Sequence, residues 1–390
     1  MSLCASEISN KHSVVVGTNM PQLRKAIRGM FREFKTLKVF EAHSSDAILK
    51  IINNELIEEE IFLIIDWDLP NASGIHTARE IRNNSKFENI PIIALMSQVS
   101  EQQIALACEI GINGCLLKPF AQKVLLEKYI HIIKSRANPP AHVKLIMEGK
   151  RFLNEGKHDE ALVLFEKSKG LSDTARISVH IGEIHEKRED FDKAKDSFSK
   201  AIEKNPNYIK AFTGVANLLI KQNDYKAALP YLEKAISLSP GNADRHMLLG
   251  LTYLKLGNPG KADISFHEAV TLDLKNSIDV GKIYLQAGNL QKSEIFLRKH
   301  LNSNTDHRDT YNKLAIALKR QGLWQKAIDE YRKAIAKYPD DEVLYFNLGK
   351  AFMEGGMAGK AKESFMKAIK LCPEFDEAKS ELIKLGEINT

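Results

Sequence analysis

Cysteine is rare in this chain, and none of its four cysteines belongs to a CxxC pair or lies beside a histidine. Cys4, Cys108, Cys115 and Cys372 are far apart along the sequence. Structural zinc sites and disulfide frameworks both need clustered cysteines, so this spacing argues against both. It is typical of a protein in the reducing cytoplasm, which is where we expect this one to be.

Long apolar runs and basic tracts are also absent. No run approaches the ~18 apolar residues that span a bilayer, and the first residues lack the apolar segment of a signal peptide. The net charge of +6 in 390 residues is spread along the chain and forms no basic arm. We therefore expect neither membrane insertion nor nucleic-acid binding.

Catalytic motifs are missing as well. The sequence contains no P-loop, no GxGxxG and no HExxH, and its 12 histidines are scattered. We therefore expect a protein that is not an enzyme. No DNA-binding output segment follows the first 140 residues either, which argues against a transcription factor.

What the sequence does contain is a helical repeat that begins after residue 141. Two successive copies close at Pro339 and Pro373, a step of 34 residues. Seven copies are phased by a small residue in the second helix of each pair: Ala161, Ala194, Ala228, Ala262, Ser293, Ala327 and Ala361. A second set of small residues lies 12 positions earlier in each copy: Gly149, Gly182, Ala216, Gly250, Gly281, Ala315 and Gly349. This pattern resembles the tetratricopeptide (TPR) repeat and implies an α-solenoid that binds proteins.

The fifth copy departs from the pattern. Its phase comes three residues early, because Ser293 follows Ala262 by only 31 residues, and it carries His300 where Ala is usual. We expect the shortened turn around residues 273–277 to change the stacking locally. A final helix that starts at Asp376 is expected to cap the array.

In the TPR family the first helix of each repeat lines the concave surface. Projecting the helical phase inward gives these candidate partner contacts: Lys210, Thr213, Asn217, Met247, Leu251, Lys255, Asn312, Ile316, Lys319, Phe346 and Lys350. The set mixes apolar side chains with Lys and Asn, which suits an extended or helical peptide with some acidic character. The alternative, that any solenoid surface has such a mixture, remains open.

The first 140 residues follow a different pattern, in which short apolar runs alternate with amphipathic segments. The strand candidates are Ser13–Val16, Leu37–Phe40, Ile61–Ile65, Ile92–Leu95 and Gly114–Leu117. Helical segments are expected near 21–33, 45–56, 73–83, 100–110 and 121–136. Nearly continuous apolar strands predict a parallel sheet covered on both faces, with functional residues at the carboxyl ends of its strands.

Two of those strand ends carry a recognisable constellation. Asp66 ends the third run and opens a D-x-x-x-P-x-x-x-G motif that closes at Gly74, and Lys118-Pro119-Phe120 follows the fifth run. Over roughly residues 12–137 the sequence resembles the receiver domain of bacterial response regulators. That resemblance implies a flavodoxin-like (βα)5 fold, with Asp66 as the phosphoacceptor position and Lys118 as the lysine that contacts the phosphoryl group. It also implies a cis Lys118–Pro119 bond.

The metal site of the family is altered in this sequence. Receivers normally carry two acidic residues after the first strand, and Thr18 and Asn19 stand in their places. Mg²⁺ is usually held through carboxylates, water and phosphate oxygens, so the change removes ligands that phosphoryl transfer needs. Asp68 remains, but in the family its position contacts the metal through the backbone carbonyl. We expect no metal or other cofactor, with Mg²⁺ at Asp66 only if the domain is active.

Two switch positions are altered too. Met96 lies where a Thr or Ser hydroxyl normally meets the phosphoryl group, and Ser97 comes one residue late, although a one-residue alignment slip would restore it to phosphoryl contact. Cys115 replaces the switch aromatic of the fifth strand. The sequence thus favours a degenerate receiver. Met96 and Cys115 as plain core residues, and Asp66 with Lys118 as a structural ion pair, are alternatives that remain open.

The sequence therefore predicts a two-part protein. Its expected parts are an N-terminal tail (1–11), a receiver-like domain (12–137), a linker (138–141), seven TPR repeats (142–375), and a capping helix with a tail (376–390). We expect a bacterial signal-transduction adaptor that binds a protein partner through the repeats. Its receiver would serve docking or dimerisation through Glu101, Gln102, Lys123, Lys128 and His131.

The alternative is a response regulator in a phosphorelay, in which a histidine kinase phosphorylates Asp66 and phosphorylation controls partner binding. A remoter reading is a scaffold for a pilus, secretion or chemotaxis assembly.

Overall fold

The computed structural model describes residues 12–31, 37–55, 60–69, 74–84, 86–87, 89–302 and 308–386. The N-terminal tail, residues 1–11, and Pro70 of the D-x-x-x-P motif lie outside these ranges. The chain forms two compact units, Met1–Pro240 and Gly241–Thr390. The boundary between the units falls inside the repeat array, so the first unit holds the α/β part together with the first repeats.

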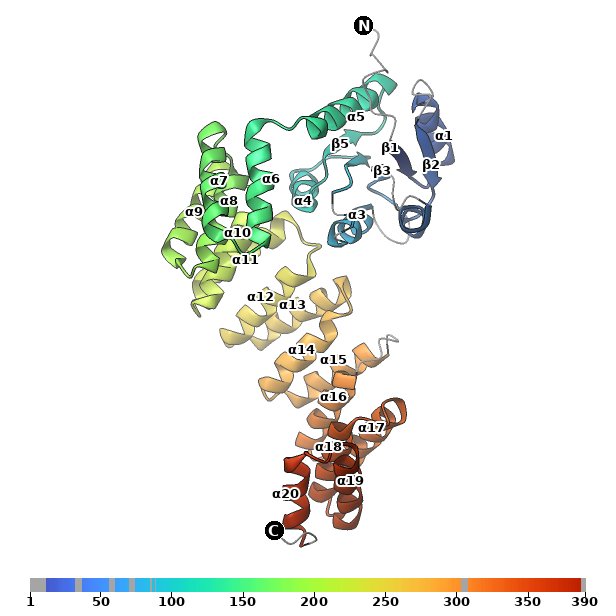
Figure 1. Cartoon of the computed structure of the whole chain (residues 1–390), viewed down its shortest axis with the longest axis vertical. Coiled ribbons are helices and arrows are strands. Elements are labelled where there is room, and N and C mark those ends of the chain that lie inside the picture. Colours follow the sequence, from blue (N-terminus) through green and yellow to red (C-terminus); the bar gives the residue numbers. More distant parts are fainter. Residues whose placement is uncertain are drawn as a thin grey trace. The chain divides into compact units, whose positions relative to one another are not determined.

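The first unit begins with a parallel sheet of five strands in the order β2-β1-β3-β4-β5 (Figure 1). The strands are β1 (His12–Gly17), β2 (Lys38–Ala42), β3 (Glu60–Asp66), β4 (Ile92–Met96) and β5 (Gly114–Leu117). The helices are α1 (Pro21–Met30), α2 (Ser45–Lys50) continued by a π-helical turn η3 (Ile51–Glu55), α3 (Gly74–Asn83), α4 (Glu101–Ile110) and α5 (Gln122–Ala137). The flavodoxin-like fold expected from the sequence is confirmed.

Both faces of this sheet are covered, which explains its continuous apolar strands. Val14 and Val16 share one buried cluster with residues of α1 and α5, whereas Val15 shares another with residues of α2, α3 and α4. Successive side chains of a strand point to opposite faces. A strand buried on both sides therefore has no polar face and loses the alternation typical of a half-exposed strand.

Tyr129 of α5 lies at the centre of the first of these clusters. Its ring packs edge-on against Phe31 (5.1 Å between centroids) and Phe62 (4.7 Å), and the side chain is fully buried. Burial raises the pKa of the Tyr129 hydroxyl to about 12. The hydroxyl group therefore stays neutral in the folded domain at a pH where it ionises in the unfolded chain.

This pKa shift should make the α/β domain sensitive to alkali. Above pH ~10 the unfolded state loses the Tyr129 proton first, so between about pH 9 and about pH 11 the free energy of unfolding should fall by about 1 kcal/mol through this group. Urea unfolding of a Trp324→Phe variant, followed by Trp67 fluorescence, measures the change. Tyr129→Phe in the same background is the control, and an equal loss of stability in both proteins would contradict the assignment.

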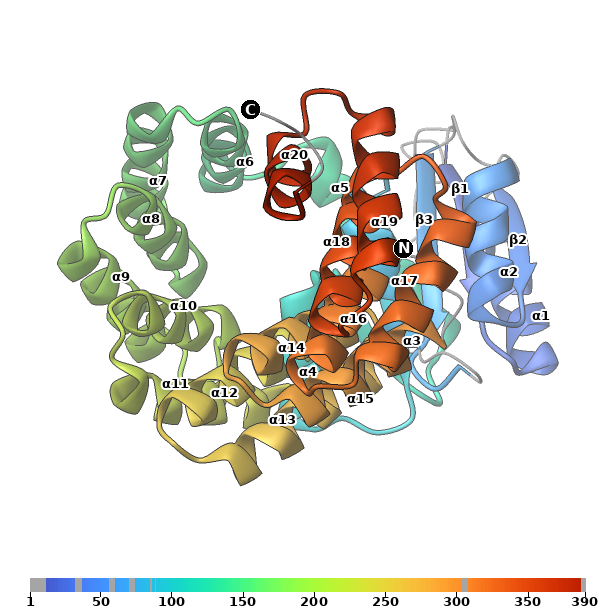
Figure 2. The ribbon, with the colours of Figure 1, turned by 90° about the horizontal axis from the view of Figure 1, so that it is seen from below.

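The rest of the chain consists of antiparallel helix pairs. The first unit holds α6 (Ala141–Asn154) with α7 (His158–Leu171), α8 (Ala175–Lys187) with α9 (Phe191–Lys204), and α10 (Ile209–Lys221) with α11 (Tyr225–Leu238). The second holds α12 (Ala243–Lys255) with α13 (Pro259–Leu272), α14 (Asn276–Gln286) with α15 (Leu290–Leu301), α16 (Arg308–Arg320) with α17 (Trp324–Lys337), α18 (Glu342–Glu354) with α19 (Ala358–Leu371), and then α20 (Asp376–Lys384). Figure 2 shows how α6 to α11 follow one another pair by pair. The predicted solenoid is confirmed.

Close helix crossings explain the small residues that phase the repeats. A Cβ at Gly250 would lie 2.5 Å from the ring of Phe266, and one at Gly182 would lie 2.7 Å from the ring of Phe198. Real Cβ atoms do not come so close to a neighbour, so only glycine lets the fully buried aromatic of the second helix reach the backbone of the first.

The fifth helix pair contains His300 at a position where the other repeats favour alanine. His300 is buried, and its Nδ1 lies 3.2 Å from the hydroxyl of Ser277, at the start of α14. The small Ser277 leaves room for the imidazole and supplies a polar partner for it, so a histidine can occupy a position where the other repeats favour alanine.

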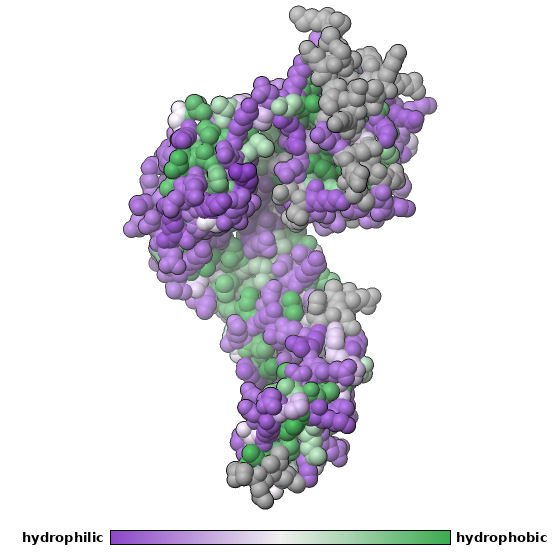
Figure 3. Space-filling model, in the orientation of Figure 1, coloured by the Kyte–Doolittle hydropathy of each residue, from purple (hydrophilic) through white to green (hydrophobic). Residues whose placement is uncertain are grey.

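At the end of the chain, α20 covers the last pair. Leu382 is buried in the same cluster as the residues of α16 to α19, and the ring of Phe375 lies 5.0 Å from that of Phe346. Across the described ranges, no helix combines the length and the apolar character needed to cross a membrane. On the face drawn in Figure 3, hydrophilic and hydrophobic residues are intermixed.

Candidate functional site

A buried carboxylate at the carboxyl edge of the sheet is the centre of the candidate site. Asp66 ends β3 and is only 1% exposed. Its Oδ1 accepts from Lys118 Nζ at 2.7 Å and from the backbone N–H of Asp68 at 3.2 Å. Its Oδ2 accepts from the hydroxyl of Thr18 at 2.8 Å. Both oxygens are therefore hydrogen-bonded inside the protein, which offsets the cost of burying the charge.

The backbone around Asp66 allows this arrangement. The Lys118–Pro119 peptide bond is cis, as the family resemblance implies. A Cβ at Gly74 would lie 2.1 Å from the carbonyl oxygen of Asp66, so no larger residue fits there without movement of the backbone. This close approach gives a physical reason for the glycine that closes the D-x-x-x-P-x-x-x-G motif.

The two residues that follow β1, Thr18 and Asn19, have different surroundings. Thr18 is fully buried, its N–H donates to the carbonyl of Ala42 at 3.1 Å, and its hydroxyl faces Asp66. Asn19 is exposed, and within the described part of the chain its side chain makes no hydrogen bond to Asp66. Of the two positions that are acidic in the family, one thus donates a hydrogen bond to Asp66 and the other is exposed to solvent.

Asp68 and Ser97 meet beside Asp66. Asp68 is exposed, and one of its carboxylate oxygens accepts from the Ser97 hydroxyl at 2.9 Å. Within the described residues Ser97 makes no hydrogen bond to Asp66. The structure therefore brings Asp66, Lys118 and Thr18 together and leaves Ser97 and Asp68 as a second pair next to them.

Met96 and Cys115 contribute to one apolar cluster next to the site. Met96 is fully buried in contact with residues that include Trp67 and Ala107, and Cys115 packs at the edge of the same cluster. Burial raises the pKa of the Cys115 thiol, with an opposing contribution from the nearby Lys128. The thiol is therefore neutral near pH 7, as in an apolar filler.

Helix α4 is buried on two sides. Ala107 faces the cluster of Trp67 and Met96, whereas Ala105 belongs to a separate buried cluster with residues of α10 and α11. Its partners there are Ile209, Phe212, Ala235 and Leu238. This contact was not predicted from the sequence. Ile104, in the same apolar stretch as Ala105, is 48% exposed, so the hydrophobicity of residues 104–107 does not by itself mark the buried sides of the helix.

The residues expected to serve receiver docking have mixed surroundings. Glu101, Gln102 and His131 are exposed. Lys123 lies 3.8 Å from Glu127 on its own helix, and Lys128 donates to the carbonyl of Cys115 at 2.9 Å. Two of the five thus make contacts within the domain, and the others are open to solvent.

The predicted concave residues of the first unit are accessible in different degrees. Lys210 is exposed, and Thr213 and Asn217 are half-buried. The Thr213 hydroxyl donates to the carbonyl of Ile209 in its own helix at 3.1 Å. This side chain is therefore partly engaged within the repeat.

In the second unit several predicted concave residues join consecutive repeats. Lys319 pairs with Glu354 at 3.0 Å, Lys350 pairs with Glu381 of α20 at 3.3 Å, and Asn312 accepts from the amide of Asn347 at 3.0 Å. The ring of Phe346 packs between those of Phe365 and Phe375. The remaining predicted residues are half-buried or, in one case, exposed: Met247, Leu251, Ile316 and Lys255. The two paired lysines therefore link consecutive elements of the array.

Comparisons with known proteins agree with this division. Residues 14–130 match the family described as response regulator receiver domain. Residues 175–208, 219–264, 317–356 and 343–375 match tetratricopeptide repeat families.

Among relatives, the chain is 26% identical over 125 residues to the chemotaxis protein CheY of Pseudomonas aeruginosa, a match that covers 32% of this chain and 98% of the relative. It is 30% identical over 107 residues to the chemotaxis protein CheY1 of Helicobacter pylori, a match that covers 27% of this chain and 84% of the relative.

Among solved structures, a tetratricopeptide repeat protein from Parabacteroides merdae matches with a TM-score of 0.42 and 18% identity, over 63% of this chain and 98% of that one. A repeat protein from Cytophaga hutchinsonii matches with a TM-score of 0.44 and 20% identity, over 52% and 83%.

Proposed function

Because the chain belongs to the response-regulator receiver family and carries tetratricopeptide repeats behind that domain, we propose that it is a signalling adaptor without catalytic activity. Its receiver would be degenerate, and its repeats would bind a protein partner whether or not Asp66 is phosphorylated.

The hydrogen bond from Thr18 to Asp66 carries this proposal. In the family an acidic residue at this position helps to hold Mg²⁺ beside the phosphoacceptor. Here a neutral hydroxyl donates to Asp66 Oδ2, and Lys118 donates to Oδ1. A phosphoryl group on Asp66 would have to displace one of these donors.

The side chains around Asp66 do not fit a magnesium ion. Mg²⁺ demands an octahedral set of oxygen ligands and favours carboxylates. Lys118 and Thr18 already engage both oxygens of Asp66, and Ser97 engages the carboxylate of Asp68. Asn19 is exposed and carries no charge. We therefore propose no step through a metal.

A fluorescence titration tests the proposal. The chain has two tryptophans, so a Trp324→Phe variant leaves Trp67, the buried neighbour of Asp66, as the sole reporter. Millimolar Mg²⁺ and then beryllofluoride, a mimic of the phosphoryl group, should leave its emission unchanged. A variant that also carries Thr18→Asp and Asn19→Asp regains two carboxylates, and its emission should respond saturably to Mg²⁺.

Asp66→Asn in each background is the matched control. If the Trp67 emission of the Trp324→Phe protein responds saturably and this response disappears with Asp66→Asn, the proposal that the receiver is degenerate is wrong. If the folded variant with Thr18→Asp and Asn19→Asp shows no change in emission with Mg²⁺, the domain lacks more of a metal site than these two acids.

One observation favours a second candidate, a phosphorylation-dependent switch. Helix α4 touches the cluster beside Asp66 through Ala107 and the repeats through Ala105, two residues away. A displacement of α4 by a phosphoryl group would therefore reach the repeats directly. This candidate requires the Asp66-dependent response that the titration measures.

A further inference from the structure

A buried acid in the sixth repeat neutralises two basic side chains. Glu330 of α17 is 5% exposed, and its Oε1 lies 3.0 Å from Arg298 Nη1 and 3.1 Å from Lys333 Nζ. The guanidinium also pairs with Glu294 at 2.9 Å. A buried carboxylate is thus held between an arginine of the preceding repeat and a lysine one turn along its own helix.

One repeat of 34 residues further on, the two cations are present and the acid is not. Arg332 corresponds to Arg298 and Lys367 to Lys333, but Ser364 takes the place of Glu330. The Ser364 hydroxyl donates to the carbonyl of Lys360 on its own helix at 2.9 Å. The seventh repeat therefore keeps the basic residues of this arrangement without the carboxylate that neutralises them.

These residues line an open groove of about 360 Å³ on α17, α18 and α19. Its lining comprises Arg332, Tyr345, Leu348, Phe352, Lys360, Glu363, Ser364 and Lys367. Leu348 and Phe352 are buried and form an apolar floor, and none of the eight belongs to the concave set nominated from the sequence.

The cations of the groove lie over aromatic rings. Arg332 is 5.9 Å and Lys360 is 6.0 Å from the centre of the Phe352 ring, and Lys367 is 5.8 Å from that of Tyr345. Within the ranges that the structure describes, Lys360 and Lys367 pair with no carboxylate, and Arg332 has only Asp329 at 3.8 Å. Three positive charges thus surround an apolar floor, with the exposed Glu363 as the single acid of the lining.

We propose that this groove binds an acidic segment of a partner protein. A carboxylate side chain of that segment takes the place between Arg332 and Lys367 that Glu330 takes between Arg298 and Lys333. An aliphatic neighbour of the carboxylate covers Phe352 and Tyr345. The apolar floor favours an acidic peptide with aliphatic residues over a nucleic acid backbone. The inference rests on the proposed function, that the repeats bind a protein partner, and it adds the chemistry of that partner and the place where it binds.

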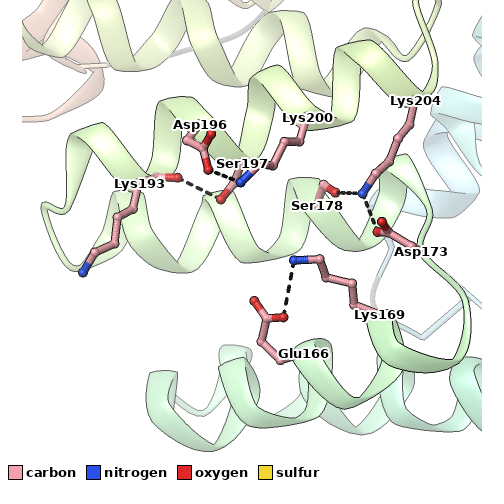
Figure 4. A network of polar contacts seen from close by, with 9 residues as sticks. All are labelled: Glu166, Lys169, Asp173, Ser178, Lys193, Asp196, Ser197, Lys200 and Lys204. Atoms are coloured by element: carbon pink, nitrogen blue, oxygen red, sulfur yellow. Dashed lines mark hydrogen bonds and ion pairs between the residues drawn. The ribbon is translucent and has the colours of Figure 1, made fainter.

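The equivalent groove of the second repeat shows why this site is distinct. There Lys169 pairs with Glu166 at 3.5 Å, Lys200 pairs with Asp196, and Lys204 contacts Asp173 and Ser178 (Figure 4). Ser178, Ile181 and His185 line it where the seventh repeat has Tyr345, Leu348 and Phe352. In the second-repeat groove these lysines are therefore paired with acids of this chain, and the floor is more polar than that of the seventh-repeat groove.

Binding of a short labelled peptide to the full-length protein tests the inference. The probe is a fluorescein-labelled peptide in which Glu and Leu alternate, amidated so that it has no C-terminal carboxylate. Fluorescence polarisation at low ionic strength should show saturable binding. Ser364→Glu installs the missing acid and should weaken binding about tenfold or more, because its carboxylate occupies the site as Glu330 does in the sixth repeat. Lys367→Glu should weaken binding to a similar degree.

Matched variants separate this site from general attraction to a basic surface. In the second-repeat groove, Ser197→Glu makes the same change as Ser364→Glu, and Lys200→Glu makes the same change as Lys367→Glu. Both should bind within about twofold of wild type. Equal weakening by Lys200→Glu and Lys367→Glu, equal binding of a peptide of alternating Gln and Leu, or tighter binding of a single-stranded oligonucleotide than of the Glu-Leu peptide would each overturn the proposal.

Discussion

Truncation of Phe365 to alanine is expected to destabilise the second unit by about 3 to 5 kcal/mol. The side chain is fully buried, and a Cβ at Gly349 would lie 2.5 Å from its ring. Its ring also packs 5.7 Å from that of Phe346. Removal of the ring leaves a cavity at a crossing with no side chain on the glycine side to fill it, so the full cost of lost contacts is expected.

Trp324 provides a local measurement of this effect. In a Trp67→Phe background it is the only tryptophan, and it begins α17 within the second unit. Its urea transition should move to markedly lower denaturant with Phe365→Ala. Met366→Ala, a truncation of the adjacent and 53% exposed side chain, should leave the transition nearly unchanged. Equal shifts for the two variants would mean that the Phe365 crossing does not limit the stability of the unit.

The helix crossings could be predicted because the same pattern of small and aromatic residues recurs in successive repeats. A small residue followed 12 positions later by another and then by an aromatic, as in Gly349, Ala361 and Phe365, recurs along the array and can be read without coordinates. The groove of the seventh repeat was missed because its signal is a difference between copies. Only alignment of Ser364 with Glu330 shows that an acid is absent while its two cations remain.

The candidate site was predictable in composition but not in detail. Asp66 and Lys118 end parallel strands, and such ends meet at one edge of a sheet, so their proximity followed from the strand pattern. The hydrogen bond from Thr18 depends on a side-chain rotamer. The pairing of Ser97 with Asp68 depends on how the chain leaves β4. Neither of these two hydrogen bonds produces a periodic pattern in the sequence. The contact of Ala105 with α10 and α11 depends on tertiary packing that residues 101–110 do not encode by themselves.

Replacement of Lys118 by methionine is expected to lower the free energy of unfolding of the α/β domain by about 3 kcal/mol near pH 7. Methionine keeps the apolar stem of the side chain but removes the ammonium that lies 2.7 Å from Asp66 Oδ1. The carboxylate, 1% exposed, then retains only the Thr18 hydroxyl and one backbone N–H. Urea unfolding followed by Trp67 fluorescence in the Trp324→Phe background measures the loss.

A second substitution shows whether the cost comes from an uncompensated charge. Asp66→Asn added to Lys118→Met replaces the buried carboxylate by a neutral amide of the same shape, so stability should return to within about 1 kcal/mol of the Trp324→Phe parent. If the double variant is as unstable as Lys118→Met alone, the lysine acts through packing and the ion pair is dispensable. If Lys118→Met costs nothing, Asp66 is better hydrated than its burial implies, and its carboxylate is freer to react than the hydrogen bonds from Thr18 and Lys118 suggest. The stability of this pair therefore bears directly on whether Asp66 is a structural anchor or a phosphoacceptor.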